Sequence, residues 1–226
     1  MKKIGFIGAF EKTDLILYIA KILVEIGKKI LVIDTTTLQR ARYIVPCISP
    51  SLSYITEYEG IDVAVGFQNY ERIIQYAGTP ELEYDIILID VDSEENFSKF
   101  DMKTADKNYF ITAFDNYSLK KGLEIIGQMQ DKVVMTKILF SRDILQEDDD
   151  YLNFLSFYFP VIWDDEIIYF PYETGDNTVI IQNQRISRIV FKDLSQQYKD
   201  SLSLIAEEIL PDIKSGDWKK AYKRLS

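Results

Sequence analysis

The sequence contains no histidine and only one cysteine, Cys47. Without histidine, imidazole is excluded as a catalytic base, a metal ligand or a pH switch near neutrality. A single cysteine excludes a disulfide within the chain and makes a thiolate metal cluster implausible. The functional groups left for chemistry are carboxylates, hydroxyls, lysine, arginine and the backbone.

Basic residues are outnumbered, with 26 Lys and Arg against 36 Asp and Glu, which gives a net charge of −10. An acidic balance argues against non-specific nucleic-acid binding, which needs a basic surface to release counterions. No uninterrupted apolar run approaches the ~18 residues of a membrane-spanning helix. The chain also begins directly with a predicted strand rather than a signal peptide, so we expect a cytoplasmic protein.

The 226 residues are 47% hydrophobic and 27% charged, a balance typical of a folded chain with a full core. The change in character near the C-terminus divides the chain into a predicted domain, residues 1–212, and a basic amphipathic tail, residues 213–226. We expect one large domain with a small appendage.

The first 34 residues predict one strand–loop–helix–strand unit. An apolar strand, Ile4 to Ile7, is followed by the loop Gly8 to Thr13 and an apolar helix, Asp14 to Ile26. Gly27 ends the helix, and the run ILVID, ending at Asp34, is typical of a strand buried on both faces of a parallel sheet.

Lys12 and Thr13 stand at the expected N-terminus of that helix. Unpaired N–H groups and the helix dipole favour an anion at such a terminus. Lys12 would add a positive charge and Thr13 a hydroxyl ligand for Mg²⁺, which predicts a phosphate site.

The unit resembles the start of the ParA/MinD family of deviant-Walker P-loop ATPases, in which a Lys-Gly-Gly-x-Gly-Lys-Ser/Thr loop precedes the helix. The run GKKILVID, Gly27 to Asp34, matches closely, and Lys12 and Thr13 fall on the last two loop positions when no gap is allowed. Ile7 then replaces the signature lysine, Ala9 a glycine, and Glu11 the glycine before the lysine. A second alignment shortens the loop by two residues with Gly8 as its first glycine, and it also lacks the last glycine. The loop is therefore degenerate, with a carboxylate where phosphates would approach the backbone.

The family likeness extends along most of the chain. The run YDIILID ends at Asp90 and resembles the Walker B strand, which implies an Mg²⁺ site at Asp90, although the glycine that normally follows is missing from residues 91–96. Residues 107–126 resemble the next strand, loop and helix, and Pro171 lies in a late segment, residues 167–173, that flanks adenine in the family. The resemblance also gives Asp34 a catalytic role at the metal-bound water, with Thr36 at the place of a second acid.

The remaining pattern alternates strands with helix-sized segments. Residues 35–60 lack a clean period and predict a loop with one short helix. The other expected elements are strands at 61–67 and 132–140 and helices at 70–78, 117–130 (capped by Asp115 or Asn116) and 195–210. This alternation predicts an α/β fold with a mostly parallel twisted sheet and helices on both faces.

Two further clusters each allow two interpretations. The acidic run Glu147 to Asp150 is typical of the first turn of a helix, with a metal site as the alternative. In the tail, Trp218, Tyr222 and Leu225 share one helical face opposite Lys219, Lys220, Lys223 and Arg224. This face could lie on an anionic membrane surface, as in MinD-like proteins, or Trp218 and Tyr222 could pack on the domain.

Three functions remain open. The resemblance implies a degenerate ParA/MinD-like protein that binds ATP or ADP with Mg²⁺ weakly or not at all. Such a protein would position or assemble a membrane-associated machine at the inner membrane face, and the expected assemblies are a homodimer and a complex with a protein partner. The alternatives are an active Mg²⁺-dependent ATPase and a nucleotide-independent interaction module whose acidic or aromatic surface recruits a basic partner.

Overall fold

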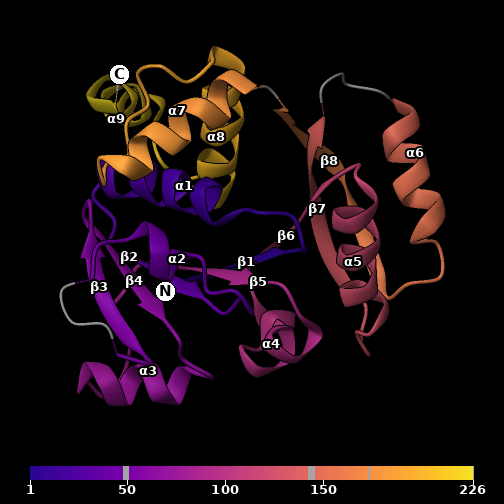
Figure 1. Cartoon of the computed structure of the whole chain (residues 1–226), viewed down its shortest axis with the longest axis horizontal. Helices are drawn as coiled ribbons and strands as arrows, with labels where there is room; N and C mark the ends of the chain where they lie inside the picture. Colours follow the sequence, from indigo (N-terminus) through magenta and orange to yellow (C-terminus); the bar gives the residue numbers. More distant parts are fainter. Residues whose placement is uncertain (48–50, 142–145, 173, 226) are drawn as a thin grey trace.

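The protein is an eight-stranded twisted sheet with helices on both faces (Figure 1). The structure, a computed structural model, describes residues 1–47, 51–141, 146–172 and 174–225. The strand order is β3-β4-β2-β5-β1-β6-β7-β8, and every neighbouring pair is parallel except β3 and β4. The predicted fold class is therefore confirmed.

The strands match the apolar runs of the sequence, because strands in the middle of the sheet are covered on both sides. Their bounds are β1 Lys2–Ile7, β2 Ile30–Asp34, β3 Tyr54–Tyr58, β4 Ile61–Val65, β5 Ile86–Val91, β6 Lys107–Ala113, β7 Val133–Ser141 and β8 Val161–Pro171. All residues of β2 and β5 are buried. The carboxyl ends of β1, β2 and β5 adjoin one another, with Asp34 beside Asp90 in the register.

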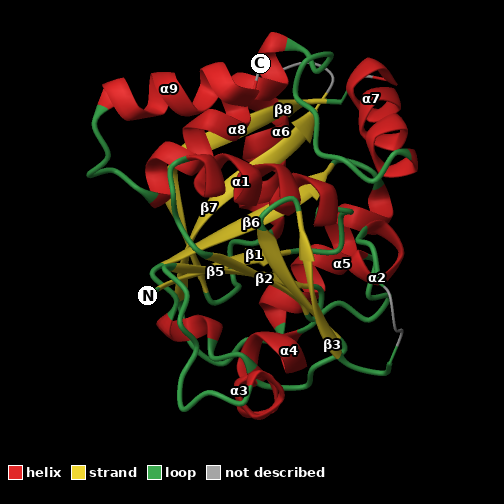
Figure 2. Ribbon diagram, turned by 90° about the vertical axis from the view of Figure 1, so that its left-hand side faces the viewer, coloured by secondary structure: helices red, strands yellow, loops and turns green. Residues whose placement is uncertain are grey.

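Two hydrophobic cores lie on opposite faces of the sheet. Figure 2 shows the helices on both sides of the strands. The first is covered by α1 Thr13–Glu25, α7 Thr174–Arg185, α8 Gln196–Ile209 and α9 Ser215–Leu225, with the short α2 Ala41–Ile44 at its border. The second is covered by α3 Tyr70–Ala77, α4 Glu94–Lys99, α5 Asn116–Gly127 and α6 Gln146–Leu155. Of the two capping candidates for α5, Asp115 is the cap, and its carboxylate accepts from the N–H groups of Tyr117 and Ser118.

The loop predicted for residues 35–60 is wrong at residues 54–58, which form strand β3. β3 pairs with β4 in an antiparallel hairpin whose two-residue turn, Glu59 and Gly60, has positive φ at both positions. A turn of this kind matches the twist of the flanking strands, which favours a hairpin over an extended loop.

Residues 215–225 form α9, which lies against the domain. Trp218 is only 5% exposed, stacks on Tyr222 and belongs to the core on the α1 side. The Tyr222 hydroxyl donates to Glu207 at 3.0 Å, and Leu225 packs on the same core. Because the apolar face of α9 is turned inward and its lysines outward, the structure favours packing over the membrane interpretation. The division of the chain at residue 212 stays a prediction.

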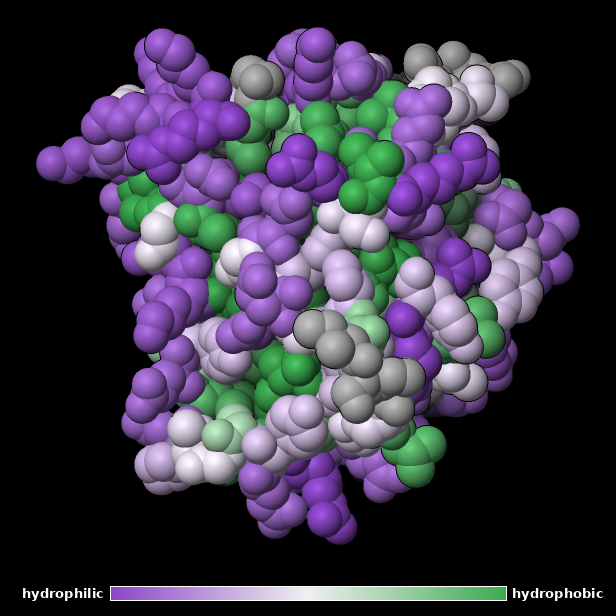
Figure 3. Space-filling model, turned by 60° about the vertical axis from the view of Figure 1, so that its left-hand side comes forward, coloured by the Kyte–Doolittle hydropathy of each residue, from purple (hydrophilic) through white to green (hydrophobic). Residues whose placement is uncertain are grey.

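The acidic run at residues 147–150 lies in the first turns of α6, as predicted. Asp149 forms an ion pair with the buried Lys137 of β7 and so fastens α6 to the sheet. The face of the molecule in Figure 3 is mainly hydrophilic, with hydrophobic side chains in scattered groups between projecting polar ones. Within the described ranges, no helix is long and apolar enough to cross a membrane.

Candidate functional site

The loop between β1 and α1 begins at a position that only glycine fits. Gly8 has a φ of +145°, and a Cβ placed on it would lie 2.2 Å from the carbonyl oxygen of Ile111 in β6. Its N–H donates to the carbonyl of Val91, at the end of β5. The first residue of the loop therefore packs closely against β5 and β6, and this contact helps to fix the positions of Lys12 and Thr13.

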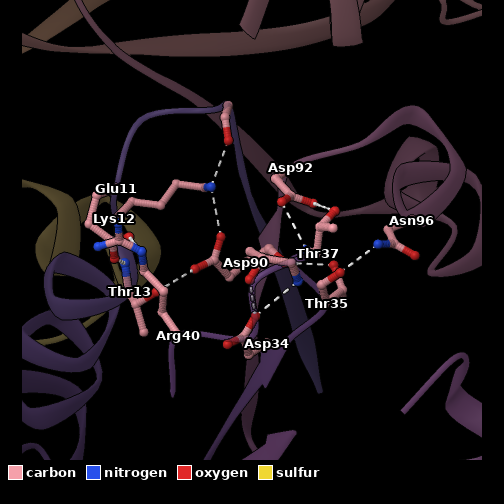
Figure 4. A network of polar contacts seen from close by, with 12 residues as sticks. Glu11, Lys12, Thr13, Asp34, Thr35, Thr37, Arg40, Asp90, Asp92 and Asn96 are labelled. Atoms are coloured by element: carbon pink, nitrogen blue, oxygen red, sulfur yellow. Dashed lines mark hydrogen bonds and ion pairs between the residues drawn. The ribbon is translucent and has the colours of Figure 1, made fainter. Parts of the chain in front are cut away.

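Lys12 is a buried cation at the N-terminus of α1 (Figure 4). Its Nζ lies 2.7 Å from Oδ1 of Asp90 and donates to the carbonyl oxygen of Gly8, also at 2.7 Å. Both side chains of the ion pair are 2% exposed. A lysine buried this deeply requires a partner, and Asp90 at the carboxyl end of β5 supplies it.

Thr13 contacts the same carboxylate from the other side. Its hydroxyl donates to Oδ2 of Asp90 at 3.1 Å, so Lys12 and Thr13 engage the two oxygens of Asp90. A threonine hydroxyl beside a carboxylate is a ligand set that suits Mg²⁺, which prefers hard oxygen donors.

The side chain of Glu11 folds back onto the N-terminus of α1 and binds a backbone N–H group there. Its Oε1 accepts the N–H of Thr13 at 3.0 Å, and its Oε2 forms an ion pair with Nε of Arg40 at 2.5 Å. Burial, followed by the negative charge of Asp90, raises the pKa of Glu11, while Arg40 opposes that rise. Burial and Asp90 thus disfavour the ionised form of Glu11, and Arg40 and the N–H of Thr13 partly compensate for this.

Asp34 is buried at the end of β2 and holds the loop that follows it. Oδ1 accepts from both the N–H and the hydroxyl of Thr36, and Oδ2 accepts the N–H of Ala41 at 2.9 Å. Burial and the charge of Asp90 raise the pKa of Asp34 to about 6. With both oxygens engaged by the chain, Asp34 acts here as the anchor of residues 36–41.

The two loops after β2 and β5 are bonded to each other. The N–H of Thr37 donates to Asp92 at 2.9 Å, and the hydroxyl of Thr35 donates to the carbonyl of Asp90 at 2.6 Å. From the opposite side, Asn96 in the first turn of α4 donates to the carbonyl of Thr35. These bonds fix the wall of the site that faces Lys12.

A cavity of about 370 Å³ opens between these loops and the N-terminus of α1. The sequence-predicted residues on its wall are Gly8, Glu11, Lys12, Thr13 and Asp90. The wall also contains residues that the sequence did not single out, and these are Phe10, Thr37, Arg40, Asp92, Tyr117 and Lys121. The volume and the convergence of charged groups are typical of a ligand pocket.

A second cavity, of about 430 Å³, adjoins the first along Phe10 and Glu11. Pro171, the predicted adenine-flanking residue, lies on its wall together with the aromatic side chains of Phe10, Phe140, Tyr172 and Tyr198. The Phe10 ring centroid lies 4.6 Å from that of Phe140 and 6.3 Å from that of Tyr172. Glu173, the last residue of the predicted late segment, lies outside the described residues.

The sequence could have indicated Asp92, because it follows a strand-ending acid by two residues. Arg40 carries no such signal, since its place beside Glu11 depends on the path of residues 35–40 across the sheet edge.

Several solved structures of ParA/MinD-type ATPases have a similar architecture. The MinC:MinD cell division protein complex of Aquifex aeolicus contains a chain with a TM-score of 0.59 and 18% identity, covering 95% of this chain and 98% of that one. A complex of an McdA variant from Cyanothece with ATP has a TM-score of 0.59 and 14% identity, covering 95% and 98%. A plasmid partition protein from Borrelia burgdorferi bound to AMPPNP has a TM-score of 0.58 and 14% identity, covering 94% and 99%.

No protein-family model matches the sequence, and no curated protein is significantly similar to it. The likeness to the solved structures nevertheless spans nearly the whole length of both chains. At these low identities the likeness concerns the fold: the chain has a P-loop NTPase fold of the ParA/MinD type.

Proposed function

We propose that this chain binds an adenine nucleotide across the two adjoining cavities and acts as a nucleotide-responsive positioning or assembly factor. The observation that carries the proposal is the buried Lys12 at the N-terminus of α1, next to Thr13 and Asp90, with an aromatic cavity directly beside it. Phosphates suit the first cavity and a planar base suits the second.

Thr13 and Asp90 are the residues that would hold Mg²⁺, because their hydroxyl and carboxylate oxygens already converge. A bound Mg²⁺ would neutralise phosphate charge in a site rich in carboxylates. Lys12 would move its ammonium from the Gly8 carbonyl towards a phosphate, and Gly8 leaves the loop backbone close to it. Tyr172, which is 59% exposed, would cover the base from the solvent side.

The leading form of the proposal is a weak binder with a degenerate loop rather than an efficient ATPase. Hydrolysis needs an oriented water and added positive charge on the phosphates. The place of the signature lysine is taken by Ile7, a fully buried strand residue, and the Asp34 oxygens are occupied by Thr36 and Ala41. An active ATPase is the enzymatic alternative, and it predicts Mg²⁺-dependent turnover.

The positioning role draws on what the similar proteins are described as doing. They include a cell division protein in complex with a protein partner and a plasmid partition protein. By that analogy we expect this chain to act with a protein partner, as a homodimer, on a machine at the inner face of a membrane. A nucleotide-independent interaction module is the third possibility.

Titration calorimetry of the purified chain with ATP, ADP and Mg²⁺ tests the nucleotide proposal. We expect saturable binding that is lost in Lys12→Met, which removes the ammonium with little change of volume. Because Lys12 also stabilises the fold, Tyr172→Ala serves as a second variant that tests binding of the adenine base in the second cavity. Absence of binding at millimolar nucleotide in the folded wild-type chain would contradict the proposal and leave the interaction module, whereas turnover of bound ATP would establish the enzyme.

A further inference from the structure

We propose that Glu11 is a specificity-determining residue of this cleft, because its carboxylate takes the position of a ligand phosphate and weakens binding more for ligands that carry more phosphates. The inference rests on the proposed nucleotide function. It concerns a side chain that stands at the entrance of α1 and lines both cavities.

The carboxylate occupies the position that an anion would take. Oε1 accepts the N–H of Thr13, one of the unpaired donors at the start of α1, at 3.0 Å. Lys12, the residue before α1, supplies no side-chain cap, so Glu11 is the group that satisfies this donor. A phosphate at the same place would have to displace the carboxylate or approach it closely.

The second oxygen holds a cation that lines the first cavity. Nε of Arg40 lies 2.5 Å from Oε2 of Glu11, and the Arg40 side chain is half exposed. Arginine is well suited to bind phosphate through several N–H groups. While it is paired with Glu11, its charge is already compensated.

The other charges of the site are compensated in the same way. Lys12 is paired with Asp90, and Lys121 lies 2.9 Å from Glu124 of its own helix. Figure 4 shows Glu11 and Arg40 on one side of the Lys12–Asp90 pair and the Asp34 and Asp92 carboxylates on the other. An incoming phosphate therefore meets cations that all have internal partners, and each further phosphate charge is opposed by Glu11.

It follows that Glu11 weakens binding in proportion to the phosphate charge of the ligand. Removing its charge frees Arg40 for the ligand and removes one repulsion. The gain is expected to be largest for ATP, smaller for ADP and absent for adenosine, which carries no phosphate charge. A like charge within a few ångströms in a half-buried site corresponds to roughly a ten-fold change in the dissociation constant.

Glu11→Gln is the sharpest test, because the amide oxygen can still accept the N–H of Thr13 while the charge is lost. Dissociation constants for ATP, ADP and adenosine are measured by calorimetry at constant Mg²⁺ for the wild type, Glu11→Gln, Arg40→Ala and the double variant. Glu95→Gln is the matched control, because it removes an equally paired but exposed carboxylate from α4. Urea unfolding of each variant is recorded in parallel.

We expect Glu11→Gln to bind ATP roughly ten-fold more tightly, to leave adenosine binding unchanged, and to lose much of its gain when Arg40 is also replaced. Equal or weaker ATP binding by Glu11→Gln, while the wild type binds ATP, would overturn the role of Glu11 and leave the nucleotide proposal standing. A gain of equal size for adenosine would also overturn it, since it would indicate a general opening of the cleft. If no folded variant binds any of the three ligands, the nucleotide proposal itself fails.

Discussion

The two adjoining cavities differ in the interactions that their side chains already make within the chain. We call the first cavity the charged end of the cleft and the second cavity the aromatic end. In the first, nearly every charge already has a partner within the chain: Lys12 with Asp90, Glu11 with Arg40 and Asp92 with the N–H of Thr37. In the second, the Phe10 ring contacts those of Phe140 and Tyr172, and these rings share the wall with carboxylates such as Asp14 and Asp176.

This difference determines what a ligand must do at each end. At the aromatic end a planar group gains contact area and displaces water, so binding is favourable from the outset. At the charged end a ligand must replace internal ion pairs that also stabilise the fold, so affinity and stability are coupled. Mutations at the charged end should therefore change both affinity and stability, whereas mutations at the aromatic end should change affinity alone.

The largest effect is expected for Lys12→Met, which would break the charged end. It leaves Asp90 buried without its cation, and a half-broken buried ion pair lowers the free energy of unfolding by about 3–5 kcal/mol. Urea denaturation followed by circular dichroism measures the loss. The double variant Lys12→Met/Asp90→Asn should recover part of it, and Lys99→Met, which breaks an exposed pair, should change stability by less than about 1 kcal/mol. A loss below that value in Lys12→Met would show that the charged end does not couple binding to folding.

A smaller effect is expected from the pH dependence of Asp34. Its folded pKa of about 6 lies above the ordinary value of 3.8, so between these values the folded state binds more protons than the unfolded state. The contribution of Asp34 to stability is therefore present below about pH 4 and is lost as the pH rises through its folded pKa, by at most about 3 kcal/mol.

Asp34→Asn removes this titration, so the difference in unfolding free energy between wild type and variant should shrink from pH 4 to pH 6 and level off above it. Glu11 and Asp14 also have raised pKa values, so only the difference between the two proteins isolates Asp34. Parallel stability curves for the two proteins over this range would refute the expectation.

The smallest effect is expected at the aromatic end. Tyr172→Ala should weaken binding of ATP and adenosine alike by about ten-fold, because a stacked ring contributes on the order of 1–3 kcal/mol per base. Tripolyphosphate binding and the urea midpoint should stay unchanged, since Tyr172 is 59% exposed. Tyr158→Ala, a similar change at a 91% exposed ring outside the cleft, is the matched control. An effect on tripolyphosphate would show that the two ends are not separate.

The fold was largely predictable from the periodic apolar runs. The residues before Asp34 and Asp90, 30–33 and 86–89, are all apolar, and both runs are buried strands with these acids adjacent in register. Strand β3 has no such signal, because residues 54–58 lie in a segment without a clean period. They become a strand by pairing with β4 across a two-residue turn. The burial of Trp218 likewise depended on whether α9 found a surface to cover, which its own helical spacing leaves undecided.

By itself, the sequence determined that Lys12, Thr13 and Asp90 would meet, because parallel strands place their carboxyl ends along one edge and a helix begins there. Only the tertiary structure decided which further residues contact this site, such as Arg40 at Glu11. Arg40 reaches Glu11 because Asp34 binds the backbone at Thr36 and Ala41 and so bends residues 36–41 back over the N-terminus of α1. Contacts of this kind depend on the path of a loop through space, which local propensities and spacing do not specify.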